Sequence, residues 1–312
     1  MSDWHVAATY LFFPLKDPAG HVEGLKSEAA RLDVGGIFVL APEGLNTTCA
    51  APSRVRLDAW IRHLEQRFSI ELACKYSTSH KQPFRRLAMK VRSEICTTGN
   101  PDLQVDNSEN NHITPEEWDR MIAEEDPVII DTRNRYEYEL GTFRGAINPK
   151  TDKFSDFFQQ VDQMDIPRDK KVMIFCTGGI RCHKGIHELQ QRGYRNVYQL
   201  EGGILKYIEQ RPDGYFDGSC FVFDHRVAVG KDLKPVAGLH HCVHCGNPAR
   251  EDITCARCDG TGYVCRECRQ DSVRAVTCSK DCANHWAERP GVRSKRLRSA
   301  QQSVQRSTRC AD

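Results

Sequence analysis

The spacing of apolar and polar positions divides the chain into two regions of regular structure. Near the N-terminus, apolar runs at Val6–Pro14, Gly35–Ala41 and Leu87–Val91 predict β-strands. Leucine and alanine recur at helical spacing within His21–Leu32, and Leu57–Phe68 shows the same period. The resulting order, β-α-β-β-α-β, predicts a ferredoxin-like α+β domain in which Leu87–Val91 is the closing strand.

The second region alternates short apolar runs with helical periodicity. Val128–Asp131, Lys171–Cys176 and Val197–Leu200 are typical of buried strands. Thr114, followed by Pro115 and an acidic first turn, predicts a capped helix start before the first of these strands. Strands that alternate with helices pair in parallel through right-handed crossovers, so a doubly wound parallel-sheet α/β domain is expected.

Five segments follow from these patterns and from shifts in composition. They are a ferredoxin-like (acylphosphatase-like) domain at residues 1–96, a linker at 97–111, an α/β domain with a C-terminal extension at 112–238, a cysteine module at 239–288 and a basic tail at 289–312. The linker is polar and aperiodic. Residues 289–311 hold seven Lys or Arg, no acid and few large apolar side chains, which predicts disorder.

Composition narrows the class of protein. No apolar run among the 312 residues approaches the ~18 needed to cross a membrane, and the start resembles no secretory signal. We therefore expect a cytoplasmic protein with no membrane partner. Disulfides are rare in that compartment, so the fifteen cysteines need another explanation. The charges behind the net value of +2 are unevenly distributed along the chain, because residues 75–92 carry six cations and no acid.

A glycine-rich loop at the end of a buried strand is the strongest catalytic signal. The loop runs Cys176-Thr177-Gly178-Gly179-Ile180-Arg181-Cys182 and leads into a helix. Inward-turned backbone N–H groups, the positive helix start and Arg181 would all favour a thiolate. Cys176 is therefore predicted to be the nucleophile and the remaining loop residues to bind substrate or an anion. The alternative is that Cys176 is a buried structural cysteine.

Two residues of this loop have two possible roles each, and a third residue near it has an expected structural role. Cys182 is either a resolving thiol for Cys176 or a residue that packs on the first helical turn. Arg181 is expected to contact an anion or substrate, with a solvated helix start as the alternative. At the end of the preceding strand, Asp131 is expected to hold loop amides or Arg133, in a structural role.

Eight cysteines form four closely spaced pairs near the C-terminus. The pairs are Cys242/Cys245, Cys255/Cys258, Cys265/Cys268 and Cys278/Cys282. Eight thiolates predict two structural zinc ions, each held by four sulfurs. The pairs can combine sequentially, interleaved or nested, and the spacing does not choose between these. Iron–sulfur binding and a disulfide scaffold are the alternatives, and a further one is that His244 or His285 replaces a sulfur as a ligand.

The basic stretch of the N-terminal domain has the composition of a nucleic-acid surface. Its cations are Lys75, Lys81, Arg85, Arg86, Lys90 and Arg92. Aromatic residues lie between them, as in surfaces that neutralise phosphates and stack bases. A solvated face is the alternative, but a second basic segment follows the cysteine module and favours RNA binding.

Several motifs resemble the rhodanese family. Asp131–Tyr138, Gly141–Asn148 and Val197–Ile204 are similar to its signatures, and the family's persulfide-carrying cysteine corresponds to Cys176. A narrower resemblance adds Leu40–Thr47 and Phe84–Leu87. With Phe221–Asp224 and Arg226-Val227, these motifs resemble the tRNA uridine hydroxylase branch, which places a ferredoxin-like domain before the rhodanese domain.

This resemblance implies oxygen-dependent 5-hydroxylation of the wobble uridine of tRNA. It makes tRNA the partner and molecular oxygen the co-substrate, and it makes Cys176 the essential thiol. The sequence contains no nucleotide fingerprint for flavin or nicotinamide and does not indicate an oligomeric state. Two other functions stay open: a sulfurtransferase that passes persulfide sulfur from Cys176 to an acceptor, and a zinc-bearing RNA-binding adaptor without activity.

Overall fold

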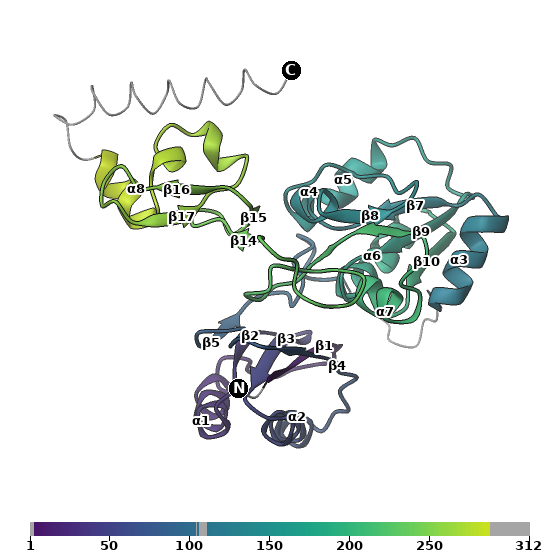
Figure 1. The fold of residues 1–312 in the computed structure, drawn as a ribbon. Helices are drawn as coiled ribbons and strands as arrows, with labels where there is room; N and C mark the ends of the chain where they lie inside the picture. Colours follow the sequence, from purple (N-terminus) through teal and green to yellow (C-terminus); the bar gives the residue numbers. More distant parts are fainter. Residues whose placement is uncertain (1–2, 104, 106–110, 288–312) are drawn as a thin grey trace. The chain divides into compact units, whose positions relative to one another are not determined.

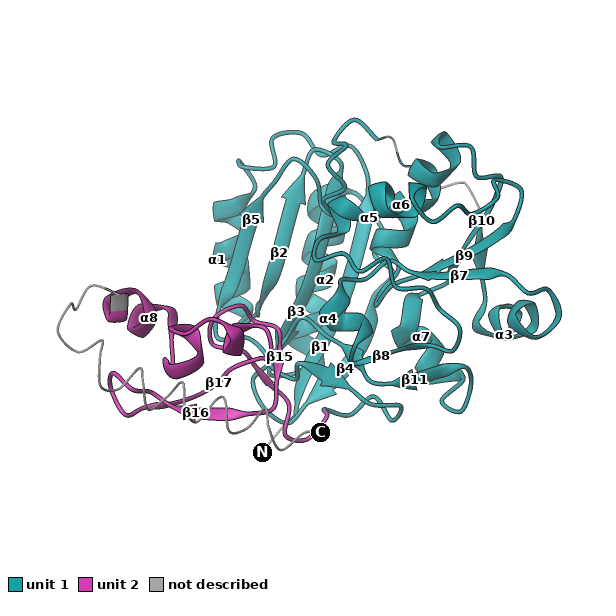
Figure 2. Cartoon of the chain, turned by 90° about the horizontal axis from the view of Figure 1, so that it is seen from above, with its two compact units in different colours: residues 1–235 teal, residues 236–312 magenta. Residues whose placement is uncertain are grey.

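The computed structural model describes residues 3–103, 105 and 111–287. They form two compact units that divide between Pro235 and Val236 (Figure 2). The predicted basic tail at 289–312 and part of the predicted linker lie outside the described residues. Among those described, no helix is long and apolar enough to cross a membrane.

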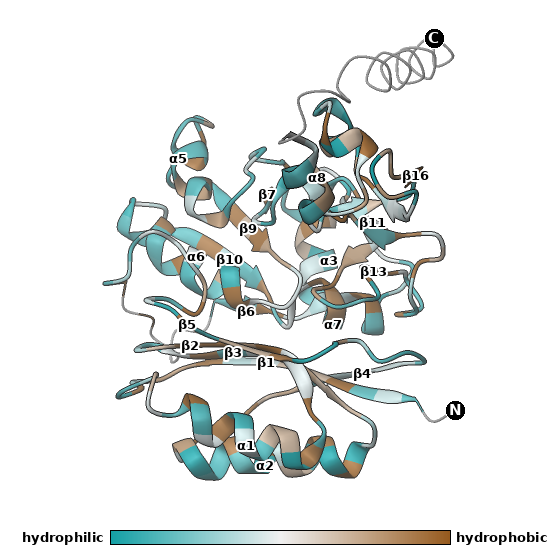
Figure 3. Cartoon of the chain, turned by 90° about the vertical axis from the view of Figure 1, so that its left-hand side faces the viewer, coloured by the Kyte–Doolittle hydropathy of each residue, from teal (hydrophilic) through white to brown (hydrophobic). Residues whose placement is uncertain are grey.

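The N-terminal part of the first unit is a five-stranded sheet with two helices on one face (Figures 1 and 3). Its elements are β1 (Trp4–Phe12), α1 (Val22–Leu32), β2 (Gly35–Ala41), β3 (Gly44–Ala51), α2 (Arg54–Phe68), β4 (Lys75–Ser79) and β5 (Leu87–Val91). The sheet order is β4-β1-β3-β2-β5. Buried side chains such as Phe38, Trp60 and Leu64 fill the space between the sheet and the helices. This confirms the predicted ferredoxin-like fold.

The prediction for the closing strand was wrong in one respect. β4 pairs antiparallel with β1 and completes the ferredoxin-like order, whereas β5 pairs parallel with β2 and extends the opposite edge. The sequence of β4, Lys-Tyr-Ser-Thr-Ser, has no apolar alternation. An edge strand with a polar sequence gives no periodic signal. The apolar pattern therefore predicts Leu87–Val91, and not β4, as the closing strand.

The rest of the first unit contains a parallel sheet flanked by helices, as predicted. Its elements are β6 (His112–Ile113), α3 (Pro115–Glu124), β7 (Val128–Asp131), α4 (Arg135–Tyr138), β8 (Gly141–Phe143), the 3₁₀ turn η1 (Phe154–Asp156), α5 (Phe157–Asp162), β9 (Lys171–Phe175), α6 (Ile180–Gln191), β10 (Asn196–Leu200) and α7 (Gly203–Gln210). The strand order β6-β10-β9-β7 is parallel throughout. At the start of α3, Thr114 Oγ1 accepts a hydrogen bond from the N–H of Glu117 at 3.2 Å.

Two short antiparallel pairs of strands complete the first unit. β11 (Phe216–Gly218) pairs antiparallel with β8, and β12 (Cys220–Phe221) pairs with β13 (Ala228–Val229). The turn between β12 and β13 reaches the N-terminal sheet, where Arg226 donates a hydrogen bond to Ser77 Oγ at 3.0 Å.

The free face of the N-terminal sheet packs on the parallel-sheet domain (Figure 3). The rings of Tyr10 and Phe12 on β1 contact that of His183 on α6, with centroids 6.1 and 5.2 Å apart. Lys184 on α6 is fully buried and pairs with Glu43 at 2.9 Å and Glu94 at 2.6 Å. The sequence predicts a linker or exposed loop at residues 97–111. Thr98 and Leu103 are instead buried, because the Glu94 carboxylate accepts hydrogen bonds from the loop that follows it.

The second unit consists of small hairpins and one helix. Its elements are β14 (His240–His241), β15 (Pro248–Ala249), β16 (Asp252–Thr254), β17 (Thr261–Tyr263), the 3₁₀ turns η2 (Cys268–Gln270) and η3 (Arg274–Val276), and α8 (Lys280–Ala287). The apolar cluster within it is small, and three of its five buried members are cysteines: Cys242, Cys265 and Cys268. Apolar burial alone gives such a module little stability.

Candidate functional site

The loop after β9 wraps around the sulfur of Cys176. The Cys176 side chain is only 1% exposed, and its Sγ accepts a hydrogen bond from the N–H of Gly179 at 3.0 Å. Gly179 has a φ of 104°, a conformation that side chains disfavour, and it is the N-cap of α6. The sulfur therefore lies at the positive end of α6, as the sequence predicts.

The surroundings of Cys176 favour its thiolate. Burial raises the pKa of this thiol, but a hydrogen bond with the Cys182 side chain, the charge of Arg181 and the N–H groups of Cys182 and Gly179 lower it. The lowering contributions win, so the pKa of Cys176 lies well below its ordinary value of 9.0. A thiolate at neutral pH is the nucleophilic form of cysteine.

Cys182 is the neighbouring thiol and remains protonated. Burial and the adjacent Cys176 sulfur raise the pKa of Cys182 well above its ordinary value. Its Sγ lies 3.6 Å from Thr132 Oγ1, and Thr132 donates a hydrogen bond to the Phe175 carbonyl at 2.9 Å. Cys182 thus packs on the first turn of α6 and also contacts Cys176, so the geometry is compatible with both sequence alternatives.

Arg181 forms a buried pair that the sequence did not reveal. Its two terminal nitrogens donate to the Glu137 carboxylate at 2.7 Å each, and Glu137 is fully buried on α4. Burial raises the pKa of Glu137, but the charge and hydrogen bonds of Arg181 outweigh it and lower the pKa overall. The pair fixes the guanidinium beside the loop, where its charge stabilises the thiolate.

Asp131 and Arg133 form a second buried pair behind the loop. The Arg133 Nη2 atom lies 2.6 Å from the Asp131 carboxylate, and both side chains have no exposed surface. Thr142 Oγ1 also donates to Asp131, at 3.0 Å. This arrangement agrees with the structural role expected of Asp131 and ties the end of β7 to β8.

The start of α7 closes the other side of the loop. The N–H of Ile204 donates to the Cys176 carbonyl at 3.0 Å, and the N–H of Leu205 donates to the Thr177 carbonyl at 3.2 Å. Gly203 makes this approach possible, because a Cβ there would lie 2.6 Å from the Cys176 carbonyl oxygen. The glycine pair before α7 therefore lets the helix hold the loop backbone.

The N-terminal domain covers one side of the active-site loop. Tyr10 on β1 places its hydroxyl 3.0 Å from where a Gly179 Cβ would stand. Lys75 on β4 donates a hydrogen bond from Nζ to the Gly178 carbonyl, and burial lowers the pKa of this lysine. Cys176 is thus enclosed between two domains that are far apart in the sequence.

The arrangement predicts that Cys176 titrates at unusually low pH. Difference absorbance near 240 nm between the wild-type chain and Cys176→Ser would report the thiolate. Because the pKa of Cys176 is lowered, we expect the signal to appear at a pH well below that at which an ordinary thiol titrates and to be lost as the pH falls through the lowered pKa. A difference signal that appears only around pH 9 would contradict the assignment, and Cys49→Ser is the control for a buried thiol outside the loop.

The predicted RNA-binding cations do not all share one environment. Lys81, Arg85, Arg86, Lys90 and Arg92 are exposed, whereas Lys75 faces the active-site loop. The structure thus separates Lys75 from the predicted surface, because β-strand alternation turns it toward the parallel-sheet domain. Lys90 lies on β5 and Arg92 directly follows it, whereas the other three exposed cations lie on the connection from β4, which crosses the end of the sheet between its two edges. We call Lys81, Arg85 and Arg86 the basic connection.

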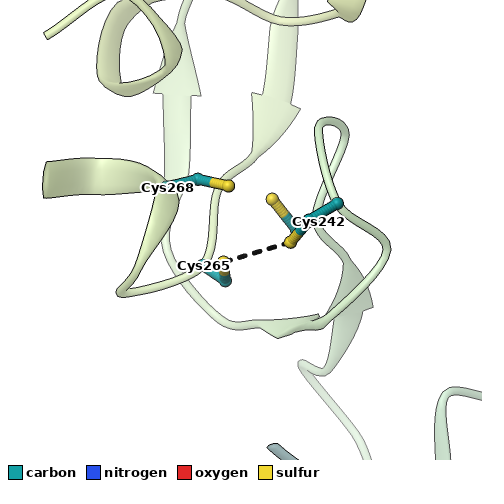
Figure 4. A group of neighbouring side chains, drawn as sticks. Cys242, Cys265 and Cys268 are labelled. Carbon is teal, nitrogen blue, oxygen red and sulfur yellow. Dashed lines mark hydrogen bonds between the residues drawn. The ribbon is translucent and has the colours of Figure 1, made fainter. Parts of the chain in front are cut away.

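The four cysteine pairs of the second unit form two quartets. The members are Cys242, Cys245, Cys265 and Cys268 in one and Cys255, Cys258, Cys278 and Cys282 in the other. Within each quartet all sulfurs lie within 4.8 Å of one another, and Figure 4 shows three of the first group converging. Of the three pairings that the sequence allowed, the structure selects the interleaved one.

The distances between the sulfurs suit a single ion in each quartet. Cys245 and Cys265 are 3.5 Å apart, and Cys258 lies 3.5 Å from Cys278 and 3.7 Å from Cys282. A tetrahedral ion with ~2.3 Å metal–sulfur bonds would separate its ligands by about 3.8 Å. A disulfide needs ~2.0 Å. The quartets therefore have the geometry of four-sulfur metal sites.

The two histidines of the module have other partners. His244 Nε2 lies 2.8 Å from the Thr277 carbonyl, and His285 Nδ1 lies 2.9 Å from the Asp281 carbonyl. Neither histidine belongs to a quartet. The sulfurs alone complete both sites.

Comparison with known proteins agrees with this architecture. Residues 4–95 match the UPF0176 acylphosphatase like domain, residues 114–210 the rhodanese-like domain and residues 217–283 the rhodanase C-terminal model. A protein of Bdellovibrio bacteriovorus named tRNA uridine(34) hydroxylase is 45% identical over 296 residues, covering 94% of this chain and 85% of its own. The chain belongs to the tRNA uridine(34) hydroxylase family.

Other members of the family are also similar over most of their length. The tRNA uridine(34) hydroxylase of a Picosynechococcus species is 39% identical, covering 86% of this chain and 91% of its own. That of Teredinibacter turnerae is 39% identical, covering 83% and 84%. Membership confirms the family resemblance drawn from the loop and N-terminal motifs. It extends over both domains of the first unit and the cysteine-rich region.

Proposed function

We propose that this protein hydroxylates C5 of the wobble uridine of tRNA, with molecular oxygen as co-substrate and Cys176 as the essential thiol. The observation that carries the proposal is the buried Cys176 thiolate, enclosed between the two domains that characterise the hydroxylase family. The relatives' name supplies the substrate class. We also propose that the protein acts in the cytoplasm, on the ground that its substrate is tRNA.

Each part of the site has a defined task in this proposal. Gly179 and the start of α6 hold the sulfur as an anion, and the Arg181–Glu137 pair keeps a positive charge beside it. Cys182 is the resolving thiol, because its side chain shares a hydrogen bond with the Cys176 sulfur. Tyr10 and Lys75 exclude water above the loop. Charged groups that are shielded from water in this way interact more strongly with a reacting base than they would in solvent.

Sulfur transfer is the second candidate, and the rhodanese loop itself favours it. A persulfide on Cys176 would accept the same hydrogen bonds from loop N–H groups as the thiolate. The N-terminal domain favours hydroxylation, because residues 4–95 match the UPF0176 acylphosphatase like domain and a relative named tRNA uridine(34) hydroxylase is similar over 94% of the chain. Sulfur transfer would use the same thiol, Cys176, within a tRNA-modifying enzyme.

We further propose that the exposed cations of the N-terminal domain bind tRNA phosphates. Charge reversal in Arg85→Glu/Arg86→Glu is expected to weaken tRNA binding at low salt and to flatten the salt dependence of the dissociation constant. The matched control is Lys26→Glu/Arg31→Glu on α1, on the opposite face of the sheet, which should bind normally. Equal affinities for both variants at low and moderate salt would remove the basic connection from the interface.

Zinc is the ion we propose for both quartets. Four thiolates in a closed tetrahedral arrangement suit zinc, and the sulfurs are too close together to surround a cluster of several irons. The role is structural, because each quartet is complete without a water or substrate position. Metal analysis is expected to find about two zinc ions per chain, and iron with visible absorbance would contradict this.

Deletion of the gene tests the activity. Mass spectrometry of nucleosides from tRNA is expected to show loss of 5-hydroxyuridine and its derivatives from the wobble position, and growth of wild-type cells without oxygen should have the same effect. Unchanged levels after deletion would discard the proposal.

A further inference from the structure

One exposed aromatic ring lies beside the active-site loop and has no task in the reaction described above. Phe223 is 46% exposed, although residues on both sides of it are buried. It lies in the turn between β12 and β13. Single exposed apolar side chains are common on proteins, so exposure alone does not indicate a site. The surroundings of Phe223 set it apart.

A chain of aromatic contacts joins this ring to the site. The rings of Phe223 and Phe221 are 5.0 Å apart at 86°, and Phe221 contacts Tyr136 at 5.1 Å. The Phe221 carbonyl lies 3.5 Å from the hydroxyl of Thr177, which is the residue after the nucleophile. The exposed ring is therefore anchored against the loop that holds Cys176.

The turn that carries Phe223 is held rigidly. The Asp224 carboxylate accepts hydrogen bonds from the Arg226 side chain at 2.9 and 2.6 Å, and both residues are buried. Val227 has a φ of 64°, which a β-branched residue adopts only when its surroundings enforce it. A fixed ring loses little conformational entropy when a ligand binds to it.

The basic connection adjoins the same turn. The N–H of His225 donates to the Pro83 carbonyl at 3.2 Å, and Pro83 lies between Lys81 and Arg85 in the chain. Both cations are exposed. A rigid aromatic face with exposed cations close by matches the chemistry of single-stranded RNA, whose bases stack while its phosphates are neutralised. A protein ligand would not need both features.

We propose that Phe223 is a stacking platform for an unpaired base of the anticodon loop, adjacent to the uridine that enters the site. This inference rests on the proposed function, and it adds the surface that positions the RNA. A base stacked on Phe223 leaves its neighbour beside the Cys176 loop. Phosphates of the same strand reach Lys81 and Arg85.

The test uses the full chain and an anticodon stem-loop RNA with 2-aminopurine next to the wobble uridine. Stacking on the protein changes the fluorescence of this base analogue. For Phe223→Ala we expect the change at saturation to be lost and the affinity to fall by roughly 5- to 150-fold, the effect of removing one stacked base. Phe223→Tyr, which keeps the ring, should retain both. Tyr76→Ala is the control, because Tyr76 has similar exposure but lies under Arg54.

Two results would overturn the inference. One is wild-type fluorescence and affinity in Phe223→Ala, and the other is an equal loss in Phe223→Ala and Tyr76→Ala. Failure of the wild-type chain to bind the stem-loop would overturn it as well. The hydroxylase proposal is judged separately by 5-hydroxyuridine in cells, so a stacking result against Phe223 leaves that proposal standing.

Discussion

Removal of the two metal ions is expected to unfold the second unit and leave the first folded. The apolar cluster of the second unit is small, and the strands of the hairpins in this unit are only two or three residues long. Structural zinc contributes about 10–16 kcal/mol per ion to the folding of such modules. Hydrogen exchange after chelation should therefore show loss of amide protection in residues 240–286, while residues of β1–β13 keep theirs.

The interleaved pairing makes this prediction more specific. Cys245→Ser/Cys268→Ser removes two sulfurs from one quartet, so one metal equivalent should remain. Cys245→Ser/Cys258→Ser removes one sulfur from each quartet, and both ions should be lost or strongly weakened. Sequential pairing would reverse these two results. A second unit that stays protected without metal would contradict the structural role altogether.

Replacement of Cys176 by serine has the largest expected effect on activity. Serine fits the same space and can accept the hydrogen bond from Gly179, so the fold should persist. Its hydroxyl stays protonated in the field that holds Cys176 as a thiolate. Loss of a nucleophile of this kind is expected to lower hydroxylation by at least about 10³-fold.

Two further variants separate the thiolate from other effects of cysteine removal. Cys49→Ser replaces a buried cysteine in the N-terminal sheet and should retain activity. If molecular oxygen oxidises the Cys176 thiolate to a sulfenic acid, the Cys182 sulfur would attack it, form the disulfide and release water, which a serine hydroxyl cannot do. Cys182→Ser should therefore keep the first turnover but slow repeated ones. Full repeated turnover by Cys182→Ser would remove the resolving role from Cys182.

Local patterns explain what the sequence could predict. The run from β9 through the glycine loop to α6 is continuous in the chain, so strand, turn and helix signals locate Cys176 without long-range information. The cysteine spacing likewise predicts two four-sulfur sites. Capping by Thr114 is also local, and the structure confirms it.

Contacts between distant residues account for what the sequence could not predict. Glu137 pairs with a residue 44 positions away, and Lys75 reaches a carbonyl 103 positions away. Neither has a periodic or spacing signal. The polar strand β4 was missed for the same reason, since its place depends on pairing with β1. The choice among metal pairings also depends on how the hairpins fold together.

The most direct test compares 5-hydroxyuridine at the wobble position of tRNA in cells that lack the gene and express either the wild-type chain or Cys176→Ser at equal levels. We predict that the wild-type chain restores this nucleoside and that Cys176→Ser leaves it at the level of the deletion. Full restoration by Cys176→Ser would contradict the central claim that the Cys176 thiolate carries the hydroxylation.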